Sequence, residues 1–151
     1  MLKLAKKTDY AIIILTHLGE AKIPVSARKV AWNYQLPYPM VANLLKMLVS
    51  SGLIKSSRGQ HGGYVLAVPA DKILLSEIIQ VTDNPFTLVE CVHDKDLCKV
   101  RQCCPTQNTL IALHNKIQQF LEKTTLATIM KDAQINNQNF EDSKYEVAHL
   151  S

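Results

Sequence analysis

Apolar residues in the first half of the chain recur at intervals of three and four, the spacing that predicts helices. The pattern predicts one helix over about residues 9–19, a second over 27–33 and a third over 39–50, with a turn at 34–37 before the third. The expected caps are Thr8 or Asp9 for the first helix and Ser26 for the second, and the expected inward residues are Ala11, Ile12, Ile14, Leu15, Leu18, Val30, Ala31, Val41, Leu44, Leu45 and Leu48.

Two strand-like segments follow, at residues 53–56 and 64–67, joined by a glycine-rich turn over 58–63. Three helices and then a hairpin is the order of a winged helix-turn-helix domain, so a mainly α fold with a small β-hairpin is predicted. The alternative is a helical domain with an ordinary hairpin and surface lysines. The candidate DNA contacts are Tyr38, Pro39, Met40, Asn43 and Lys46 in the third helix, Arg58, Gly59, His61 and Gly62 in the hairpin, and Lys3, Lys6, Lys7, Arg28, Lys29 and Lys55 for phosphates.

The second half predicts a short helix capped by Ser76, a cysteine-bearing loop and a longer helix from Pro105 to about Glu122. The longer helix carries one apolar stripe, which favours a dimerisation seam; packing onto its own domain is the alternative. The residues of the stripe are Leu110, Leu113, Ile117, Phe120 and Leu121. The expected domains are a winged helix-turn-helix DNA-binding domain (1–83), a cysteine loop that binds a cluster (84–105), a dimerisation helix (106–133, with a further short turn after Thr124) and a flexible polar tail (134–151).

Composition and charge narrow the class of protein. The 151 residues are 47% hydrophobic and 20% charged, which suits a packed domain. No run approaches the roughly 20 apolar residues that span a membrane, and the basic N-terminus lacks the features of a signal peptide, so a cytoplasmic protein is expected. Residues 1–69 carry nine Lys/Arg and two acids, a net charge of +7, whereas residues 70–151 carry −3. The first half is therefore expected to meet a polyanion, unless the surface charge is merely uneven.

Enzyme signatures are weak in this sequence. It contains no glycine-rich nucleotide-binding loop, and His17 and His61 have no pattern that pairs them with a nucleophile. A protein without catalytic activity is expected.

All four cysteines lie within 14 residues, spaced Cys91-x6-Cys98-x5-Cys104 with Cys103 adjacent to Cys104. Such clustering in a cytosolic protein indicates metal or redox chemistry. Three thiolates on one loop suit an iron–sulfur cluster, and a structural zinc site is equally compatible with the spacing alone. The candidates for a fourth ligand are His93, Asp94, Asp96, Cys103 and the more distant Asp9.

The chain from Met1 to about Met130 resembles the winged-helix family of iron–sulfur cluster regulators that includes IscR and NsrR. The resemblance lies in Thr8-Asp9-Tyr10-Ala11, in Arg58-Gly59-x-x-Gly62-Gly63-Tyr64 and in the cysteine block ending in Cys104-Pro105. Within the family, the sequence is most similar to the subgroup that regulates the SUF cluster-assembly operon.

The resemblance implies a homodimeric transcriptional repressor that binds double-stranded operator DNA and controls SUF genes. It also implies one cluster per subunit, 2Fe–2S in preference to 4Fe–4S, ligated by Cys91, Cys98 and Cys104. IscR-like members add a histidine three residues after the last cysteine, where this chain has Gln107. NsrR-like members use an aspartate of the first helix, donated across the dimer, and Asp9 matches that position. A nitric-oxide or redox sensor of the same family and a zinc-stabilised module without sensing chemistry remain the alternatives.

Overall fold

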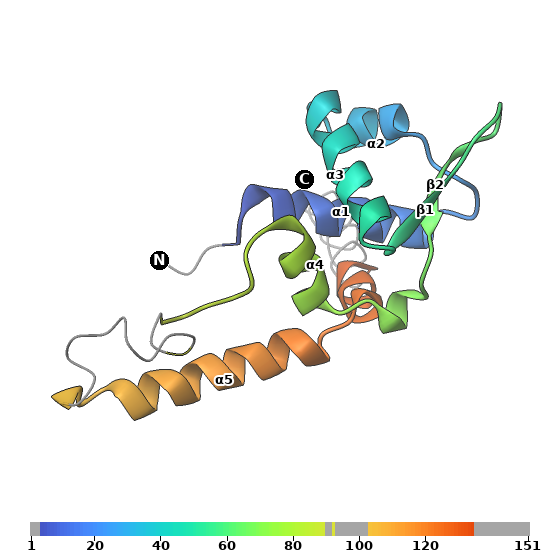
Figure 1. Ribbon diagram of the computed structural model, residues 1–151. Helices are drawn as coiled ribbons and strands as arrows, with labels where there is room; N and C mark the ends of the chain where they lie inside the picture. The colour runs from blue at the N-terminus through green and yellow to red at the C-terminus, as the bar shows by residue number, and fades with distance from the viewer. Residues whose placement is uncertain (1–3, 90–91, 93–102, 135–151) are drawn as a thin grey trace, which may run out of the picture.

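The computed structural model describes residues 4–89, 92 and 103–134. Its helices and strands follow the predicted order, and the hairpin leaves the bundle of short helices on the side away from the long helix (Figure 1). The elements are α1 (Lys6–Glu20), α2 (Ala27–Asn33), α3 (Tyr38–Ser50), β1 (Ile54–Ser57), β2 (Gly63–Leu66), the 3-10 turn η1 (Ala70–Lys72), α4 (Leu75–Thr82) and α5 (Gln107–Lys123). Residues 126–134 form a further helix after α5. The predicted mainly α winged-helix fold is confirmed.

Side-chain caps were predicted for α1, α2 and α4, and only the cap of α2 is present. The Ser26 hydroxyl caps α2 by accepting the Lys29 backbone N–H at 3.2 Å. Helix α1 instead begins at Lys6 with no side-chain cap, so capping by Thr8 or Asp9 was a wrong prediction. The Thr8 hydroxyl is buried and hydrogen-bonded to the Thr82 hydroxyl of α4 at 2.8 Å. A tertiary contact, rather than the helix end, uses this side chain.

The core of the winged part lies where the helical pattern places it. Ten of the eleven residues expected to point inward are buried, and Ile12 is half-buried against them. Buried residues after the hairpin complete this core from the second half of the chain, namely Ile73, Ile78 and Leu126. The residues around η1, α4 and the helix over 126–134 are therefore part of the same packed unit as α1, α2 and α3.

The hairpin, called the wing from here on, pairs β1 and β2 antiparallel, with Ile54 opposite Leu66. Both strands lie within one residue of their predicted positions. Tyr64 exchanges two backbone hydrogen bonds with Val25, of 2.9 and 3.1 Å, which fastens β2 to the loop before α2. A Cβ at Gly63 would lie 2.8 Å from the Val25 backbone, so this close approach requires glycine.

The second half of the chain is fastened to the first by a short backbone ladder. The Leu75 N–H donates to the Thr124 carbonyl, and the Leu126 N–H donates to the Ile73 carbonyl, each at 2.8 Å. Helix α4 begins at Leu75 with Leu74 as its N-cap, so capping by Ser76, which lies inside the helix, was a wrong prediction. The Glu77 carboxylate accepts the Leu74 N–H at 3.0 Å. From this ladder α5 extends along one side of the molecule (Figure 1).

Candidate DNA-binding surface and cysteine site

Helix α3 presents one polar face to solvent and one apolar face to the core. Tyr38, Pro39, Asn43 and Lys46 are exposed, whereas Val41, Leu44, Leu45 and Leu48 are buried. Met40, also predicted as a DNA contact, is half-buried and packs against the core. The exposed face offers an aromatic hydroxyl, an amide and an ammonium group, which are hydrogen-bonding groups suited to base edges and phosphates.

The tip of the wing is exposed and positively charged. Arg58, Gly59 and His61 are exposed, and Gly59 has a φ of +114°, which glycine adopts without strain. A Cβ at Gly62 would overlap the Ser57 carbonyl oxygen, so glycine keeps this turn tight. The structure therefore holds Arg58 on a narrow projection that suits insertion into a DNA groove.

The predicted phosphate contacts are spread over three elements. Lys6 and Lys7 of α1, Arg28 and Lys29 of α2 and Lys55 of β1 are all exposed. Lys3 lies outside the described residues. An exposed cationic side chain on each of these elements is consistent with binding of a polyanion.

One prominent surface residue was absent from the candidates drawn from the sequence. Trp32, near the end of α2, has 85% of its surface exposed. Close to it Tyr34 contacts His17 of α1 edge-on, with the Tyr34 hydroxyl 3.1 Å from His17 Nδ1. Partial burial, helped by the negative charge of Glu20, raises the pKa of Tyr34 above its ordinary value. The one tryptophan beside the turn that leads into α3 was the sequence signal for this aromatic surface.

The cysteine site is described at one of its three predicted thiolates. Cys104 lies just before α5, and its Sγ is 3.5 Å from the Thr106 hydroxyl. The hydrogen bond from Thr106 lowers the pKa of the Cys104 thiol, with backbone N–H groups at the start of α5 adding to the effect. A thiol with more thiolate character is a better metal ligand. Cys91, Cys98, His93, Asp94 and Asp96 lie outside the described residues.

Asp9 and Cys104 do not form a metal site within the described part of one chain. Asp9 is exposed in the first turn of α1, and Cys103 is exposed beside the half-buried Cys104. Among residues 4–89, 92 and 103–134, no three side chains of His, Cys, Asp or Glu are grouped closely enough to hold a metal ion.

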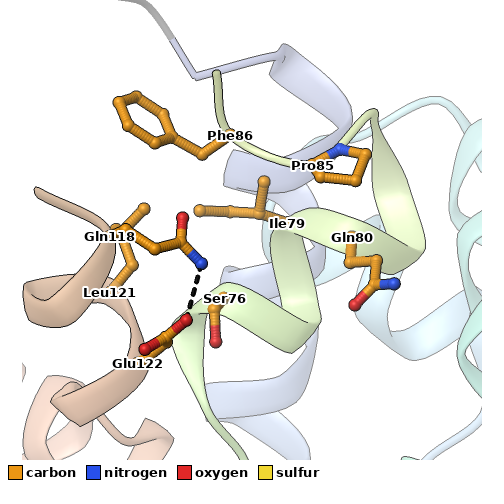
Figure 2. A pocket seen from close by; sticks show the side chains of 8 residues that line it. All are labelled: Ser76, Ile79, Gln80, Pro85, Phe86, Gln118, Leu121 and Glu122. Atoms are coloured by element: carbon orange, nitrogen blue, oxygen red, sulfur yellow. Dashed lines mark hydrogen bonds between the residues drawn. The ribbon is translucent and has the colours of Figure 1, made fainter. Parts of the chain in front are cut away.

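The junction of α4 and α5 contains a cavity of about 140 Å³. Figure 2 shows Gln118, Leu121 and Glu122 of α5 facing Ser76 and Ile79 of α4, with Pro85 and Phe86 beside them. The Gln118 amide donates to the Glu122 carboxylate at 2.8 Å. One turn earlier on α5, His114 is buried and stacks on Phe86. Helix α5 thus packs on α4 and on the residues that precede the cysteines.

The apolar stripe of α5 divides between its own domain and solvent. Leu121 is buried against the domain, but Phe120 has 66% and Leu113 44% of its surface exposed. Leu110 and Ile117 are half-buried. An exposed apolar row on a helix indicates a contact surface for another protein chain.

Residues 4–132 match the Rrf2 family model, described as an iron-dependent transcriptional regulator. Among curated relatives, the HTH-type transcriptional regulator CymR of Bacillus subtilis is 29% identical over 127 residues, covering 83% of this chain and 87% of that protein. The HTH-type transcriptional regulator IscR of Aliivibrio salmonicida is 28% identical over 138 residues, covering 89% and 80% respectively.

The solved structures similar to this chain include the same two kinds of regulator. CymR of B. subtilis, described as a global cysteine regulator, has a TM-score of 0.73 and 28% identity, covering 87% of this chain and 98% of that one. The IscR of T. potens has a TM-score of 0.67 and 28% identity, covering 87% and 88%. No described helix is long and apolar enough to cross a membrane.

Proposed function

The chain belongs to the Rrf2 family of DNA-binding transcriptional regulators, and on this premise we propose that it is a homodimeric repressor controlled by an iron–sulfur cluster. In this proposal the cluster state sets the affinity for operator DNA, and the controlled genes are those of SUF cluster assembly. The curated relatives named above are transcriptional regulators. Double-stranded operator DNA is the proposed ligand of the exposed face of α3 and of the wing.

The proposed DNA contact uses two exposed parts of one packed unit, namely α3 and the wing. The α3 side chains Tyr38, Asn43 and Lys46 face solvent, and the wing carries Arg58 at its exposed tip. The exposed cations of α1, α2 and β1 would neutralise phosphates. This arrangement supports recognition-helix binding in the major groove with the wing at the adjacent minor groove.

One observation carries the sensing part of the proposal, namely the position of Cys104 just before α5. Cys104 precedes the first residue of α5, while the far end of this helix is bonded through Thr124 and Leu126 to residues 73–75 of the winged part. A change in what Cys104 binds therefore acts on a helix that is fastened directly to the DNA-binding unit. That connection is a physical route from ligand state to DNA affinity.

The proposed ligands are Cys91, Cys98 and Cys104 of one subunit and Asp9 of the other. The lowered pKa of the Cys104 thiol and the exposed carboxylate of Asp9 fit this donor set. When bound, an iron–sulfur cluster supplies a site whose occupancy and charge respond to iron supply and oxidants. The task of Cys104 is to hold that site at the start of α5, and the task of Asp9 is to connect it to α1 of the partner.

The test is the visible absorption spectrum of protein purified without oxygen, together with its iron and sulfide content. We expect sulfur-to-iron charge-transfer bands, with a shape indicating 2Fe–2S rather than 4Fe–4S. Cys98→Ala is expected to remove the bands because one of three thiolates is lost. Cys103→Ala is the matched control and is expected to retain them. A colourless wild-type protein that contains zinc would replace the proposal with a zinc-stabilised DNA-binding module.

A nitric-oxide- or redox-sensing repressor is the second candidate. The exposed position of Asp9 in the first turn of α1 favours it, because a carboxylate donated by the partner is the ligand pattern that the resemblance associates with the nitric-oxide sensor. Loss of the absorption bands within seconds of adding nitric oxide, and slow loss under iron chelation, would favour this candidate over control by cluster supply.

A further inference from the structure

His114 is a buried polar side chain to which the proposed function gives no role. It lies in the middle of α5 with only 5% of its surface exposed. Its ring stacks on Phe86, with the centroids 5.5 Å apart and the planes 11° from parallel. Burial of an imidazole is costly unless its nitrogens are hydrogen-bonded, so the partners of this ring indicate its purpose.

The Leu88 backbone N–H donates to His114 Nδ1 at 3.3 Å. A ring nitrogen that accepts a hydrogen bond carries no proton, so this partner assigns the proton of the neutral ring to Nε2. A neutral imidazole binds metal through its unprotonated nitrogen, and here Leu88 already occupies that lone pair. The geometry therefore argues against His114 as a cluster ligand and favours a role in positioning the chain.

Leu88 and His114 join the two ends of the cysteine segment to one helix. Leu88 is three residues before Cys91, a stretch that spans at most about 10 Å. Cys104 lies three residues before α5 begins, and His114 lies about 10 Å along that helix from its first residue. The hydrogen bond thus holds the chain near the first predicted thiolate on the same helix that Cys104 adjoins.

We propose that His114 is a positioning residue that anchors the start of the cysteine segment on α5 and thereby slows loss of the cluster. The inference rests on the proposed function, because it presumes that Cys91 and Cys104 ligate one cluster. Fixing both ends of a segment reduces the entropy lost when its ligands converge, and groups beyond the ligands commonly tune metal retention in this way.

Two substitutions separate the hydrogen bond from the ring stacking. His114→Phe keeps a ring against Phe86 and removes the acceptor, whereas His114→Asn places an amide oxygen at about the position of Nδ1. We expect His114→Phe to raise the hydrogen-exchange rate of the Leu88 amide in cluster-free protein about fivefold, the effect of losing one typical hydrogen bond. Cluster loss under an iron chelator, followed by visible absorbance without oxygen, is expected to accelerate by a similar factor. His114→Asn is expected to lie close to wild type in both measurements.

His17→Phe is the matched control, because His17 contacts Tyr34, which has no part in the contact between Leu88 and His114, and it is expected to change neither rate. If His114→Phe does not fold, His114→Gln takes its place, since its acceptor lies near the position of Nε2 instead.

An unchanged Leu88 exchange rate would overturn the anchoring. Faster Leu88 exchange with an unchanged rate of cluster loss would overturn the role in retention. A wild-type protein that takes up no cluster would overturn both the proposed function and this role, and Leu88 exchange would still report the anchoring separately.

Discussion

At the scale of single residues, the wing depends on where glycine replaces a side chain. Gly62 avoids overlap with the Ser57 carbonyl, and Gly63 allows β2 to lie where a Cβ would be only 2.8 Å from the Val25 backbone. Arg58, in the same hairpin, is exposed. In the proposed function, DNA binding depends on Arg58 and the shape of the hairpin on the glycines, so a substitution of Arg58 is expected to leave the fold intact.

We predict that Arg58→Ala weakens operator binding about tenfold, or about 1.4 kcal/mol, without lowering the melting temperature. The loss follows from removing a cation that is placed to enter a DNA groove. Fluorescence anisotropy at several salt concentrations, on a duplex selected by the protein from a random pool, measures the effect. Lys123→Ala, an exposed cation at the far end of α5, is the control and should leave the affinity unchanged. Equal affinities for Arg58→Ala and wild type at every salt concentration would remove the wing from the interface.

The residues at helix starts show what a sequence reveals and what it leaves out. Ser26 and Thr8 both precede apolar residues at helical spacing, and both fit the pattern of a cap. Only Ser26 caps a helix, because the Thr8 hydroxyl is buried against Thr82, 74 residues away in the sequence. Local spacing contains no information about such a distant partner, which is why this prediction failed. The cysteines with which Asp9 would share a cluster belong to the other subunit, so the contacts within one chain do not test it. Asp9 therefore stays a proposed ligand.

At the scale of elements, α1 and α4 are joined through one buried polar contact. The Thr8 and Thr82 hydroxyls lie 2.8 Å apart, and Thr82 also donates to the Ile78 carbonyl at 2.8 Å. The Thr82 hydroxyl has one proton and donates it to the Ile78 carbonyl. Thr8 is therefore the donor in the hydrogen bond between the two hydroxyls. Helix α1 carries Asp9, proposed as a ligand of the partner's cluster, and α4 precedes this chain's own cysteines in the sequence, so the contact joins two helices that the proposal assigns to different clusters.

We predict that Thr82→Val destabilises the protein by about 1–3 kcal/mol, because it leaves the buried Thr8 hydroxyl without its acceptor. Thr8→Val is expected to cost less, about 0.5–1.5 kcal/mol, since Thr82 keeps its bond to Ile78. Urea denaturation measures both free energies of unfolding. The double variant should be no less stable than Thr82→Val alone. If Thr8→Val proved the more damaging of the two, the direction assigned to this hydrogen bond would be reversed.

The elements differed in how far the sequence could predict them. Helices α1, α2 and α3 were predicted well because one face of each is buried and the apolar spacing records that face. The helix over 126–134 was expected only as a short turn. Its place depends on Leu126 bonding to Ile73 and on Met130 packing over Gly19, contacts that the spacing of a short segment does not reveal.

At the scale of the whole molecule, the exposed apolar residues of α5 form the proposed contact surface for a second subunit. Phe120 and Leu113 are seven residues apart and lie on the same side of the helix, next to the side that packs on α4. The sequence analysis assigned the exposed side and the buried side of α5 to a single apolar stripe, because the two sides are adjacent on the helix. Only the packing of Leu121 and His114 showed which part the chain itself covers.

We predict that Phe120→Lys weakens dimerisation at least about tenfold by placing a charge in the proposed seam. Sedimentation velocity across a range of protein concentrations measures the shift toward monomer. Gln119→Lys is the matched control, since this exposed residue lies on another side of α5 and should leave the dimer intact. A wild-type protein that is monomeric at all concentrations would contradict the seam, as would an undisturbed dimer in Phe120→Lys.

The central claim is that the ligand state of the cysteines sets the affinity for DNA, and one measurement tests it most directly. Cluster-loaded and cluster-free protein are titrated without oxygen, at one salt concentration, against duplexes selected from a random pool by each form. We predict affinities that differ by about tenfold or more for at least one duplex, a coupling in the usual range for linked sites. Equal affinities of the two forms for every selected duplex would contradict the account.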